Sequence, residues 1–429
     1  MENTYKISSI IDSYISGDWG NDCTTDDTPY PVYCVRGADI VPISNSQFND
    51  IPLRYVSKRS FQTRCLQEGD IIIEKSGGSP TQSTGRVVYV SKELLSAKKN
   101  IVCSNFCTAF RVKEGWNAHY VFLYLQNVYN SGVFFNFEGK TSGLKNLMLD
   151  AAFKSIPIKK ITIAEQTALA YSISAIDKKL SLNRQINDNL EAMAKQLYDY
   201  WFVQFDFPNE KGKPYKSSGG AMAYNERLKR EIPVGWQCCC VNNLCEINKK
   251  AISKGEYHHI EYLDTGSITQ GYINHTEYYR VNAAPSRAQR KVEDMTIIYS
   301  SVRPKLLHYG VLSMPKENFI VSTGFITLDA KNKIMALMVY YFLTSDIVTR
   351  YLASIADTAV SSYPSINPED VAYLDVVLPN KDTIKKFNDI VEPMFRKMSK
   401  LRNEIAVLTK QRDELLPLLM NGQASVNSD

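Results

Sequence analysis

Several residues along the chain are of types that carry catalysis, but none stands in the pattern that its chemistry needs. Lys140-Thr141 after Gly139 resembles the end of a phosphate-binding loop, yet that loop needs another glycine where the chain has Phe134. Asn367-Pro368 leads into Glu369-Asp370, whereas an amino-methyltransferase needs a second proline and an aromatic ring to bind a flipped base. We therefore expect neither nucleotide hydrolysis nor methyl transfer from this chain.

The thiols and imidazoles do not predict a metal site. Cys103 with Cys107, and Cys240 with Cys245, have irregular spacings, and the 5 histidines provide no paired ligand motif. No glycine-rich cofactor loop follows a strand, so we expect neither metal nor cofactor. The 9 cysteines are interpreted as reduced thiols, and the start Met1–Thr4 lacks a signal-peptide pattern, which predicts a cytoplasmic protein.

Two polar stretches are better suited to reading DNA. Residues 75–86 follow the strand-like run Ile71–Ile73 and combine cations, hydroxyls and an amide with glycines that permit close backbone approach. Residues 300–305 follow the matching run Ile297–Tyr299. The residues expected to contact DNA from these loops are Lys75, Ser76, Thr81, Gln82 and Arg86 in the first, and Arg303 and Lys305 in the second. The alternative for each stretch is a solvated surface loop.

Basic clusters precede both loops. They are expected to grip phosphates beside the bases, because phosphate contacts supply most of the affinity for DNA. The residues concerned are Lys58, Arg59 and Arg64 before the first loop, and Arg287, Arg290 and Lys291 before the second. The 50 basic and 45 acidic residues leave a net charge of only +5, so any DNA-binding surface must be a local patch.

Length and hydropathy fit a soluble protein of two or three packed domains. The chain has 429 residues, of which 44% are hydrophobic. Its longest apolar run, Ile334–Leu343, has about half the length of a membrane-spanning helix. We therefore expect no membrane association.

The same landmarks occur twice, in the same order, at an offset of about 220 residues. The pairs are residues 33–40 with 262–268, 68–73 with 293–298, 100–104 with 318–322, and 156–158 with 376–378. Each copy has short Val/Ile/Tyr/Phe runs broken by Gly, Pro and Asn, which predicts a strand-rich mixed domain of about 140 residues. The order of the landmarks indicates a duplication.

A helical pattern of the same register follows each copy. Steps of four and three residues from Leu169 and from Phe387 meet mostly apolar positions, the repeat typical of a coiled coil. Helices of roughly 37 residues would be about 55 Å long, and we expect them to pair antiparallel. The seam residues are Leu169, Ile173, Ile176, Leu180, Leu190 and Leu197 in the first helix, and Phe387, Val391, Met394, Met398, Leu401, Ile405, Leu408 and Leu415 in the second. Asn183 and Asn187 lie in the seam either as buried contacts that fix its register or as solvated positions.

Several motifs resemble those of the specificity subunits of type I restriction-modification enzymes. They are Asn189–Asp206 and Arg412–Gly422 at the ends of the two helices, Ile156–Ile158 with Ala164–Gln166, Glu231–Trp236, and Gly69–Ile72. The resemblance covers essentially the whole chain in family order. It implies two target-recognition domains, each reading half of a split sequence in double-stranded DNA. It also implies two separate modification subunits that supply cofactor and catalysis, and leaves open whether restriction subunits join them.

The expected organisation is an α+β fold in which two similar mixed α/β domains are separated by two long antiparallel coiled-coil helices, as an internal repeat. The expected segments are a recognition domain at 1–160, a helix at 161–205, a linker at 206–235, a second recognition domain at 236–380 and a second helix at 381–422. The alternatives are a single-chain DNA-modifying enzyme whose catalytic domain has unfamiliar motifs, and a structural coiled-coil adaptor.

Overall fold

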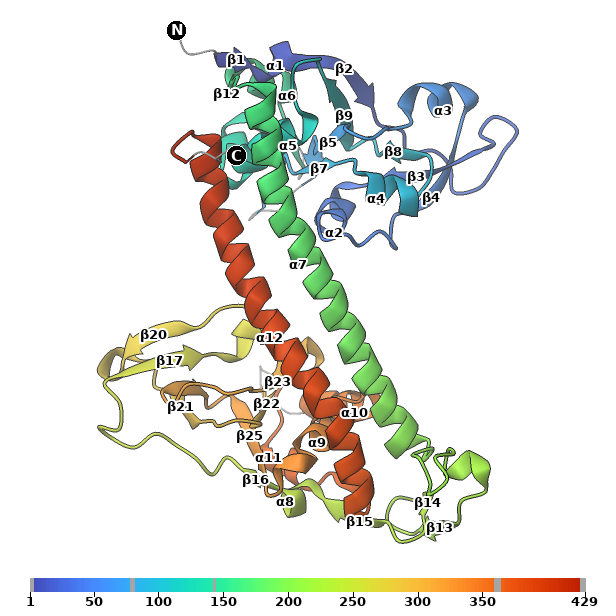
Figure 1. Ribbon diagram of the computed structural model, residues 1–429, viewed down its shortest axis with the longest axis vertical. Coiled ribbons are helices and arrows are strands. Elements are labelled where there is room, and N and C mark those ends of the chain that lie inside the picture. The colour runs from blue at the N-terminus through green and yellow to red at the C-terminus, as the bar shows by residue number, and fades with distance from the viewer. Residues whose placement is uncertain (1–3, 78–81, 142–143, 359–363, 425–429) are drawn as a thin grey trace. The chain divides into compact units, whose positions relative to one another are not determined.

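The computed structural model of the chain describes residues 4–77, 82–141, 144–358 and 364–424 (Figure 1). The chain forms two compact units. Unit 1 comprises Met1–Leu182 with Ile405–Asp429, and unit 2 comprises Asn183–Glu404. Each unit therefore contains one globular segment together with part of each of two long helices, α7 (Ile163–Tyr198) and α12 (Lys381–Met420).

Unit 1 is built on a four-stranded antiparallel sheet, β2-β9-β5-β7, and a three-stranded sheet, β4-β3-β8. The strands of unit 1 are β1 (Thr4–Lys6), β2 (Ile11–Ser16), β3 (Tyr30–Val35), β4 (Leu53–Val56), β5 (Ile71–Glu74), β6 (Ser76–Gly77), β7 (Val87–Tyr89), β8 (Ile101–Cys103), β9 (Cys107–Val112), β10 (Glu138–Thr141), β11 (Leu144–Leu147) and β12 (Pro157–Lys159). Its shorter helices are α1 (Ile7–Ile10), α2 (Ile40–Ser44), α3 (Lys58–Arg64), α4 (Lys92–Ala97), α5 (Ala118–Asn130) and α6 (Leu149–Ser155).

Strand β5 is apolar along its first three residues because both of its faces are covered. Successive side chains of a strand point to opposite faces of the sheet. Ile71 and Ile73 belong to the cluster that includes Val121 of α5, whereas Ile72 belongs to the cluster that includes Val35 of β3. The strand thus runs through the core of unit 1 and ends at Glu74, in the candidate site described below.

Unit 2 is built on two four-stranded sheets, β16-β25-β22-β23 and β20-β17-β24-β21. The strands of unit 2 are β13 (Met222–Asn225), β14 (Arg230–Pro233), β15 (Gln237–Cys240), β16 (Cys245–Ile247), β17 (His259–Leu263), β18 (Ile268–Thr269), β19 (Tyr272–Ile273), β20 (Glu277–Arg280), β21 (Ala288–Lys291), β22 (Ile297–Ser300), β23 (Tyr309–Val311), β24 (Phe319–Ser322), β25 (Phe325–Ala330) and β26 (Asp375–Leu378). Its shorter helices are α8 (Val241–Leu244), α9 (Ala336–Leu343), α10 (Asp346–Thr358) and α11 (Pro368–Ala372).

The main strand pairings are the same in the two units. Strand β3 pairs parallel with β8 and antiparallel with β4, as β17 does with β24 and β20. The sheet β2-β9-β5-β7 has its counterpart in β16-β25-β22-β23, and the pair β1-β12 in β15-β26. The duplication and the α+β fold predicted from the sequence are therefore confirmed.

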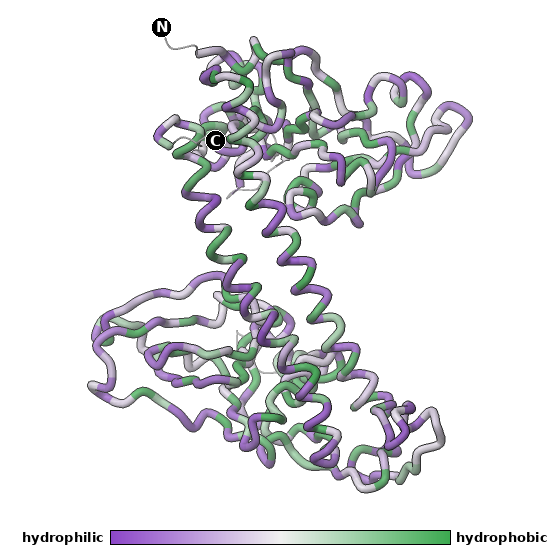
Figure 2. Tube along the Cα trace, in the orientation of Figure 1, coloured by the Kyte–Doolittle hydropathy of each residue, from purple (hydrophilic) through white to green (hydrophobic). Residues whose placement is uncertain are grey.

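Helices α7 and α12 pack antiparallel within each unit. In unit 1, Leu169 and Ile173 near the start of α7 share a core with Leu419 near the end of α12. In unit 2, Trp201 in the π-helical turn after α7 (Asp199–Val203) lies 5.9 Å from Phe387 near the start of α12, between ring centroids. Figure 2 shows hydrophilic and hydrophobic residues alternating along both helices, as expected of helices with one buried face.

Most residues of the predicted seam are buried or half-buried, and Leu415 at its end is not. Leu415 is 38% exposed, whereas the adjacent Leu416 is 3% exposed. An α-helix turns about 20° per heptad relative to a strict 3.5-residue repeat, so about four heptads from Phe387 shift the buried face by most of one residue. The other seam residues are buried (Leu169, Ile173, Leu180, Phe387, Val391, Met398, Leu401) or half-buried (Ile176, Leu190, Leu197, Met394, Ile405, Leu408).

Both asparagines of the seam are buried. Asn183 is 1% and Asn187 0% exposed, which excludes the solvated alternative. The side-chain amide of Asn187 donates a hydrogen bond to the Tyr272 hydroxyl on β19. Asn187 thus ties helix α7 to the globular segment of unit 2.

The connection at 206–235 is folded. Strands β13 and β14 form a hairpin in it, and the Phe207 ring stacks on Trp236 with centroids 4.7 Å apart, inside the core of unit 2. The Asp206 carboxylate accepts hydrogen bonds from the backbone N–H and hydroxyl of Ser217 at 2.7 and 2.6 Å. Aromatic residues among the charges and glycines supply core contacts that composition alone does not predict.

Candidate nucleic-acid interface

The first candidate site lies where β5 ends in unit 1. Glu74 is 2% exposed, and its carboxylate accepts two hydrogen bonds from Arg86, from Nε at 2.9 Å and from Nη2 at 2.6 Å. The hydrogen bond with Glu74 raises the pKa of Arg86. Arg86, predicted to contact DNA as part of a loop, is therefore held in a fixed orientation by a buried carboxylate.

Two glycines make room for this carboxylate. A Cβ atom at Gly37 would lie 2.5 Å from Oε1 of Glu74, and a Cβ at Gly77 would lie 2.7 Å from the same oxygen. Gly77 also has a φ of 144°, which side-chain-bearing residues rarely adopt. The pair of Glu74 and Arg86 is thus enclosed by backbone that only glycine allows to approach so closely.

A cavity of about 720 Å³ opens beside this pair. Trp19, Arg36 and Phe106 contribute to its walls, together with the predicted residues Ser76, Gln82 and Arg86. Phe106 is 55% exposed. Sequence reasoning missed the first three as site residues, although Arg36 belongs to a repeated landmark and Phe106 follows closely after another.

The hairpin β10-β11 borders the same loop. Ser76 and Gly77 of β6 pair with Asn146 and Lys145 of β11, and the ammonium group of Lys145 donates to the Gln82 carbonyl at 3.2 Å. Thr81, predicted to contact DNA, lies outside the described residues. Ser76 and Gly77 on one side of the loop, and Gln82 on the other, are therefore anchored to β11.

The basic residues before this loop fall into two groups. Lys58 and Arg59 are exposed on α3, and no described residue forms an ion pair with either. Arg64 instead donates to the Gly17 carbonyl at 2.7 Å and lies 3.6 Å from the Asp18 carboxylate. Lys75 is half-buried. The exposed pair on α3 is the more available to phosphates, while Arg64 stabilises the segment that leads to the cavity.

The second candidate site follows β22 in unit 2. Ser300 is buried at the end of this strand, and the exposed Arg303 has a left-handed backbone with a φ of 47°. Lys305, also exposed, lies 2.6 Å from the Asp357 carboxylate. The loop therefore presents Arg303 and Lys305 at the surface, with the charge of Lys305 balanced by a neighbouring acid.

The cluster before the second loop is only partly exposed. Arg287 is exposed. Arg290 is half-buried and donates to the Asn248 carbonyl at 3.1 Å, and burial lowers the pKa of its guanidinium. Lys291 forms an ion pair with Glu256. Of these three cations, Arg287 is therefore the one most open to a phosphate.

Strand register identifies equivalent positions in the two loops. The backbone N–H of Glu74 donates to the Arg86 carbonyl at 2.9 Å, and that of Ser300 donates to the His308 carbonyl at the same distance. Both loops thus begin at equivalent points, but the counterpart of Arg86 is His308 and not Arg303. The sequence landmarks align the strands and do not resolve this pairing.

The motifs that resembled catalytic ones lie in ordinary strands and helix ends. Gly139, Lys140 and Thr141 belong to strand β10 and not to a loop between a strand and a helix. Asp370 accepts the backbone N–H of Asn367 at 2.7 Å at the start of α11. Among the described residues, no group of three or more His, Cys, Asp and Glu side chains is placed to hold a metal ion. No described helix is long and apolar enough to cross a membrane.

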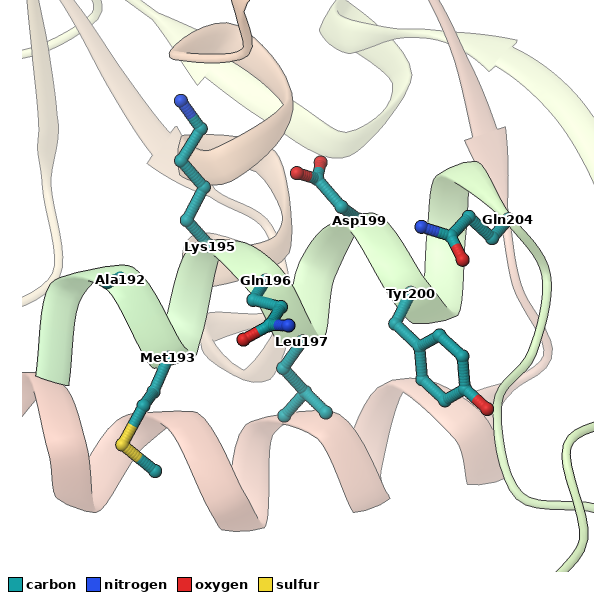
Figure 3. Close-up of a pocket in the computed structure, with 8 residues that line it drawn as sticks. All are labelled: Ala192, Met193, Lys195, Gln196, Leu197, Asp199, Tyr200 and Gln204. Carbon is teal, nitrogen blue, oxygen red and sulfur yellow. The ribbon is translucent and has the colours of Figure 1, made fainter. Parts of the chain in front are cut away.

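A groove of about 710 Å³ runs along the end of α7 in unit 2. In Figure 3, Met193, Leu197 and Tyr200 extend to one side of the helix, and Lys195 and Asp199 extend to the other. Met193 is 52% exposed. The groove thus places the exposed Met193 beside the half-buried Leu197 and Tyr200, which pack against the core of unit 2, with charges on the other side of the helix.

Part of the first half of the chain is similar to a known family of domains. Residues 39–192 match the family described as "Type I restriction modification DNA specificity domain". This range contains Glu74, Arg86 and most residues that line the cavity of unit 1, although Trp19 and Arg36 precede it, and it ends within α7.

Two relatives are specificity subunits of type I restriction enzymes, and one of them matches nearly the whole chain. The chain is 22% identical over 410 residues to the specificity subunit of the type I restriction enzyme MjaIX from Methanocaldococcus jannaschii, covering 91% of this chain and 88% of that protein. It is 27% identical over 139 residues to the HindI specificity subunit from Haemophilus influenzae, covering 32% of this chain and 30% of that protein. The resemblance to type I specificity subunits is thereby confirmed.

A solved structure has the same fold. The crystal structure of the type I restriction-modification system S subunit from M. genitalium superposes with a TM-score of 0.61 at 16% identity, covering 97% of this chain and 95% of that one. Because identity is this low, the likeness extends to the fold and not to individual site residues.

Proposed function

We propose that the chain is the DNA-recognition subunit of a type I restriction-modification methyltransferase, and that it has no catalytic activity of its own. Each unit reads one half of a bipartite DNA site. The observation that carries this proposal is the repeated strand pairing, in which β5 and β22 each end at a polar, cationic loop. A chain that offers two equivalent reading loops suits a target made of two short sequences.

The long helices account for a spacer between the two half-sites. Helices α7 and α12 have 36 and 40 residues, and each is continuous from one unit into the other. At 1.5 Å per residue they are about 54 and 60 Å long. We assign them the role of fixing the number of unread base pairs between the two half-sites.

The helices also provide docking sites for modification subunits. The groove at Met193, Leu197 and Tyr200 lies in unit 2. In unit 1, Leu415 occupies the seam position of α12 that Leu197 occupies in α7. Leu415 and Leu418 are 38% and 41% exposed there. Two equivalent apolar surfaces favour two copies of one partner, which would bring the cofactor and the catalytic residues that this chain does not supply.

The alternative is that the chain transfers methyl groups by itself. Purified chain, incubated with a methyl donor and DNA, should transfer none, whereas the assembly with modification subunits should methylate DNA at specific sites. Methyl transfer by the isolated chain would overturn the non-catalytic assignment.

The reading of half-sites is tested by substitution in one unit. Arg287→Ala with Arg303→Ala should weaken binding by the assembled complex to its own site by about tenfold or more, as expected for lost phosphate and base contacts. Scrambling the half-site read by unit 2 should then cost little further affinity, while scrambling the other should cost as much as before. Lys211→Ala, an exposed cation remote in sequence from both loops, is the matched control. Equal loss of discrimination at both half-sites would contradict the assignment.

A further inference from the structure

One hydrogen-bonding edge of Arg86 has no partner among the residues that the structure describes. Its guanidinium has three edges, and the one formed by Nε and Nη2 is occupied by Glu74. No described residue accepts a hydrogen bond from Nη1. The edge formed by Nη1 and the second N–H of Nη2 presents two parallel donors, and Arg86 lines the cavity of unit 1.

The orientation of this edge is fixed. The Arg86 side chain is 14% and the Glu74 side chain 2% exposed, and Gly37 and Gly77 hold backbone against the carboxylate. A side chain fixed in this way loses little conformational freedom when it binds a ligand. The pair is therefore more than a surface cation, because its donors are positioned before any ligand arrives.

The charge of the pair argues against a phosphate as ligand. Glu74 balances the positive charge of Arg86 and would repel a phosphate group in the cavity. Although the charge of the pair is balanced, the N–H donors of the guanidinium keep their positions. The matching ligand is a neutral group with two acceptors side by side, which in the major groove of DNA is guanine with O6 and N7.

We propose that Arg86 reads a guanine through O6 and N7 in the half-site of unit 1, with Glu74 as its positioning residue. This inference rests on the proposed function. Unit 2 has Ser300 and His308 at the matched positions, and Nδ1 of His308 lies 2.5 Å from the Ile268 carbonyl. Neither side chain offers two parallel donors, so the two units read different bases at this position and the whole site is asymmetric.

The test uses the full chain assembled with its modification subunits, after its DNA site has been mapped. Each guanine of both half-sites is replaced in turn by 7-deazaguanine, which lacks N7, and by inosine, which keeps O6 and N7 but lacks the minor-groove amino group. At one guanine, replacement by 7-deazaguanine should lower the affinity of the complex for DNA roughly 5- to 150-fold. Replacement of the same guanine by inosine should change the affinity little. In Arg86→Gln the 7-deazaguanine penalty at that guanine should disappear, and in the matched control His308→Gln it should remain.

The outcomes separate this inference from the proposed function. Failure to bind any bipartite site would overturn both. Binding to a bipartite site in which the 7-deazaguanine penalty survives Arg86→Gln unchanged would overturn the guanine assignment alone. The panel on the unaltered chain keeps the test decisive if Arg86→Gln does not fold, because the assignment also fails when no guanine depends on N7. Glu74→Gln should reduce discrimination at the same guanine while leaving binding of the other half-site unchanged.

Discussion

Leu415 and Leu416 are adjacent residues of the same type, and truncating each should have very different effects. The seam counted from the sequence includes Leu415, whereas the structure buries Leu416 and leaves Leu415 38% exposed. Leu416 shares a core with Leu169 and Ile173 of α7. Leu416→Ala therefore removes contacts between α7 and α12 inside unit 1, while Leu415→Ala truncates a side chain that lies at the surface.

The size of the difference follows from burial. Truncating a buried leucine to alanine lowers the free energy of unfolding by about 2–5 kcal/mol, because transfer energy is lost and a cavity remains. Surface substitutions change it by about 0.5 kcal/mol or less. In a domain of about 150–250 residues each kcal/mol moves the Tm by about 2–4 °C. Leu416→Ala should therefore lower the Tm of unit 1 by about 4–20 °C, and Leu415→Ala by about 2 °C or less.

Differential scanning calorimetry of the two full-length variants measures this. Circular dichroism before melting checks that both contain their helices. The difference should concern one transition if the two units melt separately. A loss for Leu415→Ala equal to or larger than that for Leu416→Ala would refute the helix register and support the strict seam. As a second readout, Leu415→Ala should weaken assembly with the modification subunit if Leu415 belongs to the docking surface.

Burial lowers the pKa of His119 to about 4, with a smaller effect of Lys178, so the unfolded chain binds a proton that the folded chain rejects. The free energy of unfolding should fall as pH drops from 6.5 toward 4, by up to about 3 kcal/mol, and His119→Phe should flatten this slope in urea titrations at several pH values. Burial raises the pKa of Cys34 to about 12, so a thiol reagent at pH 8 should label the exposed Cys23 at once and Cys34 only on unfolding; rapid labelling of both in the folded chain would contradict the burial. Removing one heptad from each of α7 and α12 should shorten the spacer by roughly 3 base pairs without changing the bases read, since the helices lose about 10 Å. Methylated sites made by that variant provide the measurement, and an active variant with an unchanged spacer would contradict the role of the helices in setting the spacer.

The repeat was predictable because each copy contains apolar, strand-forming runs. Such runs indicate buried strands from neighbouring residues alone. Ile71–Ile73 and Ile297–Ile298 are apolar at successive positions, and each stretch proved to be a central strand covered on both faces. The pairing of β3 with β8 and of β17 with β24 joins distant parts of the sequence. Their landmarks nevertheless occur in the same order in both copies, and that order made the duplication visible.

The candidate site was predictable as a region and not as a set of contacts. The loop after β5 was found from its polar composition, but the partner that fixes Arg86 is a glutamate at the end of the strand itself. The sequence predicted Lys291 as a phosphate contact, whereas in the structure it forms an ion pair with Glu256. Trp19 lines the cavity although nothing in its local sequence marks it. Residue type gives the chemistry that a side chain can offer, whereas tertiary contacts decide which of these side chains are still available to a ligand.

The most direct test of the central claim is a map of the bases methylated by the chain assembled with its modification subunits. The proposed function predicts two short defined blocks, separated by a spacer of fixed length and undefined sequence, with the unit 2 substitutions Arg287→Ala and Arg303→Ala relaxing one block only. A single continuous recognition sequence, or relaxation of both blocks by substitutions in unit 2, would contradict the assignment of one half-site to each unit.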